Sequence, residues 1–250
     1  MRKVVRTLIF FLIVDVIFIN CTEFAWSKEI PQKKIVYLTF DDGPSFSNTD
    51  AILDVLCRNN IKATFCVVGE NVIANKGTTN RLNRLGMGII PHCNCHEYNV
   101  IYSSLDDYIK DLQECEKNIN KTIGENKKYK MVRIPGGSAN TVCEQSILMK
   151  IKDAIKSNNM YYIDWNLDCG DTYASKVDKS IIEKNILNYC GRRQIEVILM
   201  HDLENKTTTT ESLQSIIDRY KELGYEFKII DDMENWEIEY LINNKVINRN

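Results

Sequence analysis

The chain has 250 residues, of which 44% are hydrophobic and 26% are charged, and its formal net charge at pH 7 is -2. This composition supports a folded domain with a substantial apolar core. The near-neutral charge leaves no basic surplus, so nucleic acid is excluded as an expected partner.

The amino-terminal residues have the order of a secretory signal. The basic stretch MRKVVR precedes the apolar run LIFFLIVDVIFI and the small residues of FAWS. The run is shorter than the ~20 apolar residues that span a bilayer, so residues 1–27 are predicted to be a signal peptide cleaved near Ser27. An uncleaved membrane anchor is the alternative, and lipidation at Cys21 is disfavoured by the bulky Asn20 before it. We expect residues 28–250 to be secreted or associated with the cell wall.

Strand-like and helix-like segments alternate along the rest of the chain. Apolar runs rich in β-branched and aromatic residues predict strands, and amphipathic runs of helical period predict helices. The expected strands are 34–40, 61–69, the end of 82–92, 130–137, 160–166, 195–202 and 226–231. The expected helices are 50–60, the start of 82–92, 103–124, 145–159, 179–193 and 210–225.

About seven βα units of this kind predict an α/β fold, a distorted or incomplete (β/α) barrel in a single domain. Ser104 and Gly124 are the expected caps of the longest helix. The last sixteen residues, from Asn235, are expected at the edge of the barrel.

The distinctive polar groups of the chain each follow a predicted strand. DD follows YLTF, HCNCH follows GIIP, PGG follows KMVRI, DW follows YYI and HD follows VILM. In barrels of this type the active site is built at the carboxyl ends of the strands. We therefore expect these groups to converge on one site.

Two of the three histidines, His92 and His96, are four residues apart. At this spacing they share one face of a helical turn and can bind one metal, whereas the two cysteines between them are out of phase. A catalytic zinc has three protein ligands and an open position. The adjacent aspartates Asp41 and Asp42 are a source for the third ligand, because the Gly-Pro turn after them lets one bind while the other stays free.

The nine cysteines leave two readings open. Cleavage near Ser27 would remove Cys21 and leave an even number, and disulfides are permitted outside the cell. A domain of this size does not need such cross-links, so buried free thiols are an equal alternative.

Five segments resemble, in order, the motifs of the polysaccharide deacetylases, carbohydrate esterase family four with the NodB homology domain. They are TFDDGP (Thr39–Pro44), HCNCH (His92–His96), RIPGGS (Arg133–Ser138), DW (Asp164–Trp165) and LMH (Leu199–His201). These motifs occupy most of residues 34–232, so 28–250 is interpreted as the catalytic domain. HEYNVIYSS and RIPGGSAN look like bacterial members that act on cell-wall glycans.

The resemblance implies a metal site and two proton-transfer groups. Asp42, His92 and His96 would bind the metal, which is expected to be zinc, with cobalt, nickel and manganese as alternatives. Asp41 would be the free carboxylate that takes a proton from water, and His201 would be the acid that protonates the leaving amine.

Two further residues are expected to hold these proton-transfer groups in place. Arg133 is the candidate for holding Asp41, and Asp164 is the candidate for holding His201. The two tethers could be exchanged, or Asp164 could pair with Arg133.

Four residues are predicted to contact the substrate. A backbone N–H after Pro135, near Gly136, is expected to bind the oxyanion, since glycine permits close approach. Trp165 and Leu199 are expected to form a pocket for the acetyl methyl group.

The metal-binding loop departs from the family pattern at Cys93, where serine or threonine is usual. A thiol is a weak hydrogen-bond donor, so a looser loop is expected. Cys95 could pair with a nearby thiol or be recruited by a soft metal.

The predicted activity is metal-dependent hydrolysis of N-acetyl groups from N-acetylglucosamine residues of a cell-wall glycan, first of all peptidoglycan, with release of acetate. The alternatives are an O-acetyl esterase on acetylated xylan, a deacetylase of chitin oligomers and a catalytically silent glycan-binding wall protein. A monomer is expected, with membrane contact only through an uncleaved N-terminal segment.

Overall fold

A fully buried strand, β1 (Ile35–Asp41), lies at the centre of the sheet in the computed structural model, which describes residues 33–249. Its sequence IVYLTFD has no exposed residue, as is typical of a parallel strand covered on both faces. It pairs in parallel with a strand on each side. The other strands of this sheet are β2 (Thr64–Val68), β3 (Gly88–Cys93), β6 (Leu167–Asp168), β7 (Ile195–His201) and β8 (Glu226–Phe227).

The order across the sheet is β3-β2-β1-β7-β6, with β8 paired to the start of β1. All of these pairings are parallel, so the carboxyl ends of the strands lie at one edge. Asp41 and His201 are register partners at the ends of β1 and β7. The first and last thirds of the sequence therefore meet at this edge.

A second, two-stranded ladder joins β4 (Met131–Val132) to β5 (Tyr161–Tyr162), also in parallel. It continues the curve beyond β3, since the amide of Arg133 donates to the carbonyl of Pro91 at 3.2 Å. The predicted α/β fold with a mostly parallel sheet in one domain is confirmed, and within residues 33–249 the strand ladder does not close into a complete barrel.

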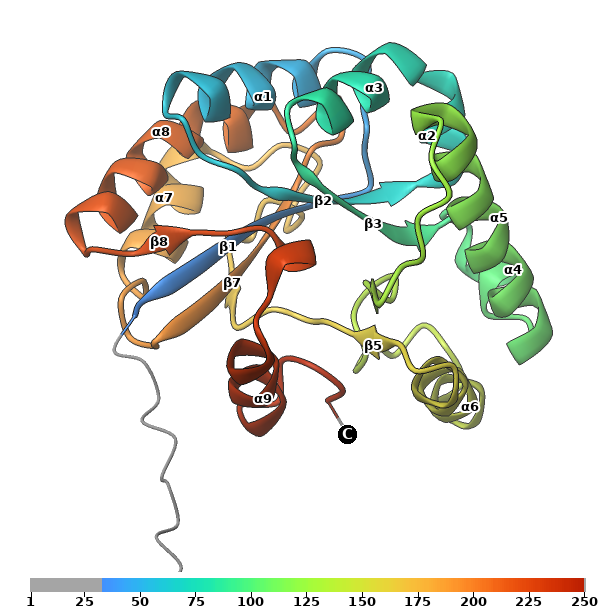
Figure 1. Cartoon of the computed structure of the whole chain (residues 1–250). Helices are drawn as coiled ribbons and strands as arrows, with labels where there is room; N and C mark the ends of the chain where they lie inside the picture. Colours follow the sequence, from blue (N-terminus) through green and yellow to red (C-terminus); the bar gives the residue numbers. More distant parts are fainter. Residues whose placement is uncertain (1–32, 250) are drawn as a thin grey trace, which may run out of the picture. The chain divides into compact units, whose positions relative to one another are not determined.

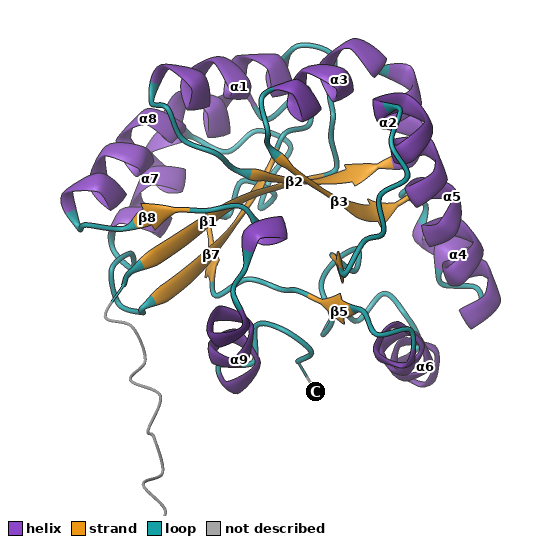
Figure 2. Cartoon of the chain, in the orientation of Figure 1, coloured by secondary structure: helices purple, strands orange, loops and turns teal. Residues whose placement is uncertain are grey.

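Helices surround the strands on the outside, as Figures 1 and 2 show for the described part of the chain. They are α1 (Asn48–Arg58), α2 (Gly69–Ala74), α3 (Lys76–Arg84), α4 (Tyr98–Ile101), α5 (Leu105–Ile123), α6 (Gln145–Ser157), α7 (Lys179–Leu187), α8 (Thr207–Glu222) and α9 (Asn235–Asn243), with a 3-10 turn at Ile230–Asp232.

The longest of these helices, α5, has the caps that its sequence predicts. The hydroxyl of Ser104 accepts a hydrogen bond from the amide of Asp107 at 3.1 Å. At the other end Gly124 adopts a left-handed conformation with φ of 72°, which glycine enters without steric cost. These caps fix both ends of the helix that packs behind the metal-binding loop.

The C-terminal segment forms backbone contacts with the chain that follows β5, in addition to lying at the edge of the fold. After α9, the carbonyl of Val246 accepts from the amide of Asp164 at 2.8 Å. Ile247 forms an antiparallel bridge with Ile163. The segment therefore lies beside the chain that leaves β5 (Figure 1).

The predicted signal peptide, residues 1–27, lies outside the described residues. Among residues 33–249, no helix has the length and apolar character required to cross a bilayer. The eight cysteines in this range are all free thiols. Several of them, including Cys66 and Cys115, are fully buried among apolar side chains.

Candidate metal centre

The carboxyl end of β1 presents two consecutive aspartates to one site. Asp41 ends the strand, and Asp42 adopts a left-handed conformation with φ of 77°, which aspartate tolerates better than most residues. At Gly43 an added Cβ would lie 2.0 Å from a carboxylate oxygen of Asp202. Only glycine fits there, and the resulting turn brings both carboxylates to the same side.

His92 and His96 reach the site from the end of β3 and from the bend that follows it. His92 lies within the strand and His96 just before α4, so the expected helical turn is wrong. Because the strand ends at Cys93 and the chain bends back, the rings come together with centroids 5.4 Å apart. A four-residue spacing therefore serves the same purpose on a strand and bend as on a helix.

The tautomer of His92 is fixed by the backbone. Its Nδ1 lies 2.7 Å from the carbonyl oxygen of Arg133, and a carbonyl can only accept, so Nδ1 carries the proton. Nε2, which lies 3.3 Å from Oδ1 of Asp42, is then the ring nitrogen available to a cation. This arrangement is common for histidines that bind metals.

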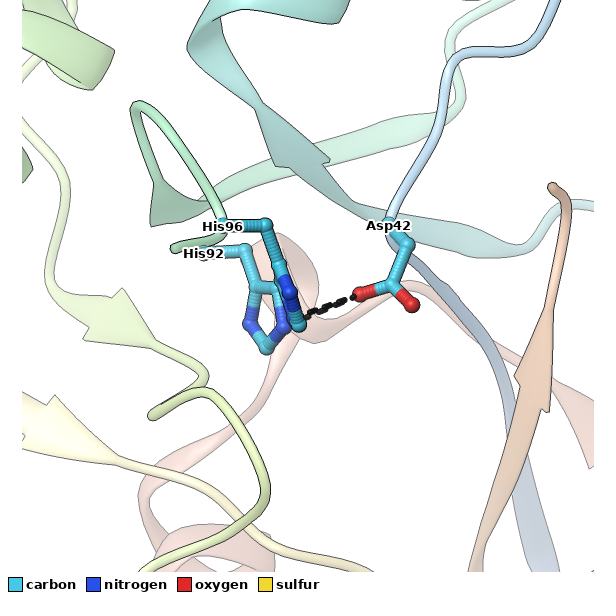
Figure 3. Close-up of side chains that lie close together, drawn as sticks. All are labelled: Asp42, His92 and His96. Carbon is cyan, nitrogen blue, oxygen red and sulfur yellow. Dashed lines mark ion pairs between the residues drawn. The ribbon is translucent and has the colours of Figure 1, made fainter. Parts of the chain in front are cut away.

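The three side chains converge as Figure 3 shows. Oδ1 of Asp42 lies 3.3 Å from Nε2 of His92 and 3.2 Å from Nε2 of His96. Donors placed tetrahedrally at ~2.0–2.2 Å from a zinc ion would be about 3.3–3.6 Å apart. The donor set and its spacing therefore fit a divalent cation, and the chain can supply three ligands to it.

Electrostatics keep Asp42 in the form that binds metals. Burial would raise the pKa of Asp42, but hydrogen bonds from His92 and His96 and the positive charges of His92 and His201 outweigh it and hold this pKa well below its ordinary value. A deprotonated carboxylate is the ligand form.

A carboxylate from α5 braces the metal-binding loop, and sequence reasoning missed it. Asp111 accepts hydrogen bonds from the amides of Asn94 at 2.6 Å and Cys95 at 3.1 Å. Cys93 is buried in an apolar cluster, and neither cysteine belongs to the group that could hold a metal. Asp111 therefore gives the loop two hydrogen bonds that do not depend on the thiol of Cys93.

Arg133 lies beside Asp41 in the interior. Its Nη1 is 3.2 and 3.3 Å from the two carboxylate oxygens of Asp41 and also donates to the hydroxyl of Thr39. The guanidinium is fully buried. Such a contact fixes the orientation of the Asp41 carboxylate beside Asp42.

His201 is held by Asp171, and the prediction that Asp164 holds it is wrong. Nδ1 of His201 lies 2.7 Å from Oδ1 of Asp171, whose other oxygen accepts from the backbone amide of His201 and from the hydroxyl of Thr209, both at 2.8 Å. Burial lowers the pKa of His201, but Asp171 outweighs this effect and raises the pKa to about 9.

Asp164 instead shapes the loop after β4. Its carboxylate accepts from the amide of Ser138 at 2.9 Å and from the hydroxyl of the same residue at 2.5 Å. Arg133 reaches only its backbone carbonyl, at 3.4 Å. Asp164 therefore supports the turn that contains Gly136. It directly precedes Trp165 in the chain.

The sequence pattern did not indicate Asp171, because this residue follows a strand of only two residues. β6 is too short to produce a periodic pattern, yet it pairs with β7 in the register Asp168 with Leu199. The segment LDCGD, with Gly170 in a left-handed conformation at φ of 72°, is the available signal. A carboxylate just beyond a strand end is the same feature that identified Asp41.

These residues surround one hollow of about 270 Å³. Its lining combines the metal-site residues with apolar and polar neighbours: Asp41, Asp42, His92, His96, Tyr98, Gly136, Trp165, Asp168, Thr172, Leu199 and His201. Pro135 is absent from this lining, and its carbonyl accepts from the hydroxyl of Tyr102 at 2.6 Å. Tyr98, Asp168 and Thr172 were not predicted from sequence.

A cation site, a free carboxylate held by an arginine and an imidazole held by a carboxylate thus face one another. This set defines a metal-dependent hydrolase that attacks a carbonyl carbon.

Comparisons with known proteins agree with this class. Residues 28–149 match the family model for polysaccharide deacetylases. YheN of Bacillus subtilis, assigned to the polysaccharide deacetylases, is 31% identical over 82% of this chain and 70% of its own length. A peptidoglycan-N-acetylglucosamine deacetylase of Bacillus cereus is 29% identical over 86% of this chain and 76% of its own.

Solved structures show the same relationship. The catalytic domain of a peptidoglycan N-acetylglucosamine deacetylase from Eubacterium rectale superposes with a TM-score of 0.74 at 29% identity, covering 82% of this chain and 91% of that one. The Bacillus cereus polysaccharide deacetylase Bc1974 gives 0.70 at 28% identity, over 80% and 95%. This chain belongs to the polysaccharide deacetylase family.

Proposed function

We propose that this protein removes acetyl groups from N-acetylglucosamine residues of peptidoglycan and releases acetate. The observation that carries the proposal is the convergence of Asp42, His92 and His96 between a tethered base and a tethered acid. The named activity of relatives such as the Bacillus cereus and Eubacterium rectale enzymes supports the choice of glycan.

Asp42, His92 and His96 would hold a divalent cation, for which we propose zinc because two imidazoles and one carboxylate are a frequent zinc ligand set. When bound, such a cation polarises the acetyl carbonyl and makes water a stronger acid.

Asp41 is the general base of the proposed reaction. Its carboxylate lines the hollow beside Asp42, and Arg133 holds its orientation. It accepts the proton of the attacking water as the carbon–oxygen bond forms. Arg133 donates to both carboxylate oxygens, so it limits rotation of the base during this transfer.

His201 is the general acid. An amine leaves only when its nitrogen is protonated, and Nε2 of His201 is free to donate because Nδ1 is engaged by Asp171. The raised pKa of about 9 keeps His201 protonated at neutral pH. The proton passes from Nε2 to the sugar nitrogen as the carbon–nitrogen bond breaks.

The acetyl group is placed by the remaining residues of the hollow. Trp165 and Leu199 provide the apolar wall for the methyl group. Gly136, at φ of 72°, brings its backbone close to the hollow, and we assign its N–H to the developing oxyanion. A Cβ at the neighbouring Gly137 would lie 2.9 Å from the Trp165 ring, so the backbone of this turn packs closely against that ring.

The sequence before the described residues fits a protein that acts outside the cytoplasm. We propose that residues 1–27 direct secretion, with cleavage near Ser27, and that the mature enzyme works as a monomer in or near the cell wall. Mass spectrometry of the secreted protein tests the cleavage site directly.

Acetate release from acetylated glucosamine oligomers and from acetylated xylan, with and without added zinc, tests the activity. We expect zinc-dependent release from the glucosamine oligomers and from peptidoglycan, and none from the Asp41→Asn variant. Release from xylan alone would favour the esterase alternative. Glycan binding without release from either substrate would favour a silent wall protein.

A further inference from the structure

Two aromatic side chains, Phe46 and Tyr173, are highly exposed on the surface of the described part of the chain. Phe46 is 81% exposed and Tyr173 is 72% exposed, the two highest values among the large hydrophobic side chains described. Single exposed apolar residues are common on protein surfaces, so exposure alone indicates nothing. Phe46 and Tyr173 are candidates for a binding role because of the loops on which they lie and the hydrogen bonds that fix those loops.

Both rings lie on loops at the carboxyl edge of the sheet. Phe46 follows Asp42 by four residues in the loop from β1 to α1, and Tyr173 follows Asp171 by two residues in the loop from β6 to α7. β1 and β6 are the two neighbours of β7, whose last residue is His201. The loops that carry Phe46 and Tyr173 therefore follow the two strands next to β7.

The loop of Phe46 is tied to the loop after β7. Glu204 accepts a hydrogen bond from the backbone amide of Ser47 at 3.0 Å and another from its hydroxyl. Asn48 donates from its side chain to the carbonyl of Leu203 at 2.9 Å. The backbone on the C-terminal side of Phe46 is therefore fixed, although the Phe46 side chain is exposed to solvent.

The loop of Tyr173 is tied to the same segment by a buried ammonium group. Lys206 is only 5% exposed, and its Nζ donates to the carbonyls of Asp171 at 2.8 Å, Ala174 at 3.0 Å and Ser175 at 3.2 Å. Burying an ammonium group is costly unless it is fully hydrogen-bonded. The interior charge of Lys206 thus holds in place a loop whose aromatic side chain faces solvent.

The hollow leaves room for these rings to contact neighbouring sugars. Its volume of about 270 Å³ is below the ~300–1,000 Å³ of sites that enclose drug-sized ligands. It suits one acetylated sugar, so the adjoining sugars of a polymer must lie on the rim. Tyr173 directly follows Thr172, a lining residue, and the charge of Asp168, another lining residue, raises the pKa of Tyr173.

We propose that Phe46 and Tyr173 form a two-ring platform that binds the sugars on either side of the acetylated residue. The flat C–H face of a pyranose ring packs against an aromatic face while its hydroxyls stay in water, and rings on a fixed backbone lose little freedom on binding. The platform rests on the proposed function and makes the enzyme select glycan chains over short fragments.

The test compares the N-acetylglucosamine hexamer with the monosaccharide, which has no adjoining sugar, using zinc-loaded wild type, Phe46→Ala and Tyr173→Ala. We expect each variant to raise KM for the hexamer by roughly 3- to 10-fold, with kcat for the hexamer and all values for the monosaccharide unchanged. Tyr173→Phe should behave as wild type because it keeps the ring. The matched control is Tyr189→Ala, since Tyr189 is 51% exposed but lies between α7 and the start of β7, at the opposite edge of the sheet.

Calorimetric binding of the hexamer to the same proteins separates the platform from the chemistry. A weaker Kd for the Phe46→Ala and Tyr173→Ala double variant, with Tyr189→Ala equal to wild type, supports the platform whether or not acetate is released. An unchanged Kd for the double variant overturns it. Absence of acetate release from wild type contradicts only the proposed function.

Discussion

The contact between Asp171 and His201 determines the pH range in which His201, the proposed general acid, holds its proton. Asp171→Asn removes a negative charge 2.7 Å from Nδ1 of His201. Burial opposes the charged imidazole, yet Asp171 outweighs it and raises the pKa from 6.5 to about 9. The difference corresponds to about 3 kcal/mol of preference for the protonated form.

Without that carboxylate the burial still lowers the pKa of His201 and the charges of Asp42 and Asp41 still raise it, so the pKa should fall back toward about 6.5. At about pH 7.5 roughly a tenth of the Asp171→Asn molecules would then carry the proton, against nearly all of the wild type. Turnover should therefore drop about tenfold at this pH from titration alone. Loss of the tautomer that Asp171 enforces lowers the plateau further at every pH.

The assay is kcat against pH for zinc-loaded protein. We expect the alkaline limb of the wild type near pH 9 and that of Asp171→Asn more than one pH unit lower. Asp168→Asn is the control, because Asp168 lines the same hollow but makes no hydrogen bond to His201. An alkaline limb that stays in place in Asp171→Asn would refute the assignment of His201 as the acid tuned by Asp171.

The contact between Asp171 and His201 also stabilises the fold, by an amount that depends on pH. His201 has a raised pKa in the folded state, so the stabilisation is complete below about 6.5, the unfolded value, and is lost as the pH rises through about 9. The difference in free energy of unfolding between wild type and Asp171→Asn should shrink over that range in urea titrations. A difference that grows with pH would contradict the assigned direction.

Three further outcomes follow from the site. His92→Ala should lose bound zinc and activity with an unchanged circular dichroism spectrum, whereas an unfolded variant would make the centre structural. His201→Ala should keep its zinc and lose about 10²–10⁴ in kcat, and a kcat equal to wild type would assign the proton to another group. Arg133→Met should reduce the free energy of unfolding by about 3–5 kcal/mol, because it leaves Asp41 buried without its partner. Urea denaturation measures this loss, and a value near zero would contradict a stabilising contact between Arg133 and Asp41.

Much of this site could be predicted from short sequence signals, for a physical reason. Strands such as β1 and β7 are seven residues long and fully buried, so their apolar runs are unmistakable. The sequence therefore predicts that the groups at their ends, Asp41, Asp42 and His201, lie at one edge of a parallel sheet.

The errors arose where local pattern and tertiary position diverge. Asp171 follows a two-residue strand that has no periodic signature, whereas Asp164 follows a clear apolar run and was chosen in its place. Asp111 lies in the amphipathic α5, where a polar residue is expected to face water. Its role in holding the loop of Cys95 depends on how that helix packs, which no local signal records.

The pairing of Val246 with Asp164 links the end of the described chain to the acetyl pocket. Asp164 supports the Ser138 turn through its carboxylate, and its own amide is anchored by the Val246 carbonyl. Proteolytic trimming back to α9 would strip away this anchor and free the turn that carries Gly136. An affinity tag intended for purification is consequently safer appended beyond residue 249 than substituted for the residues that precede it.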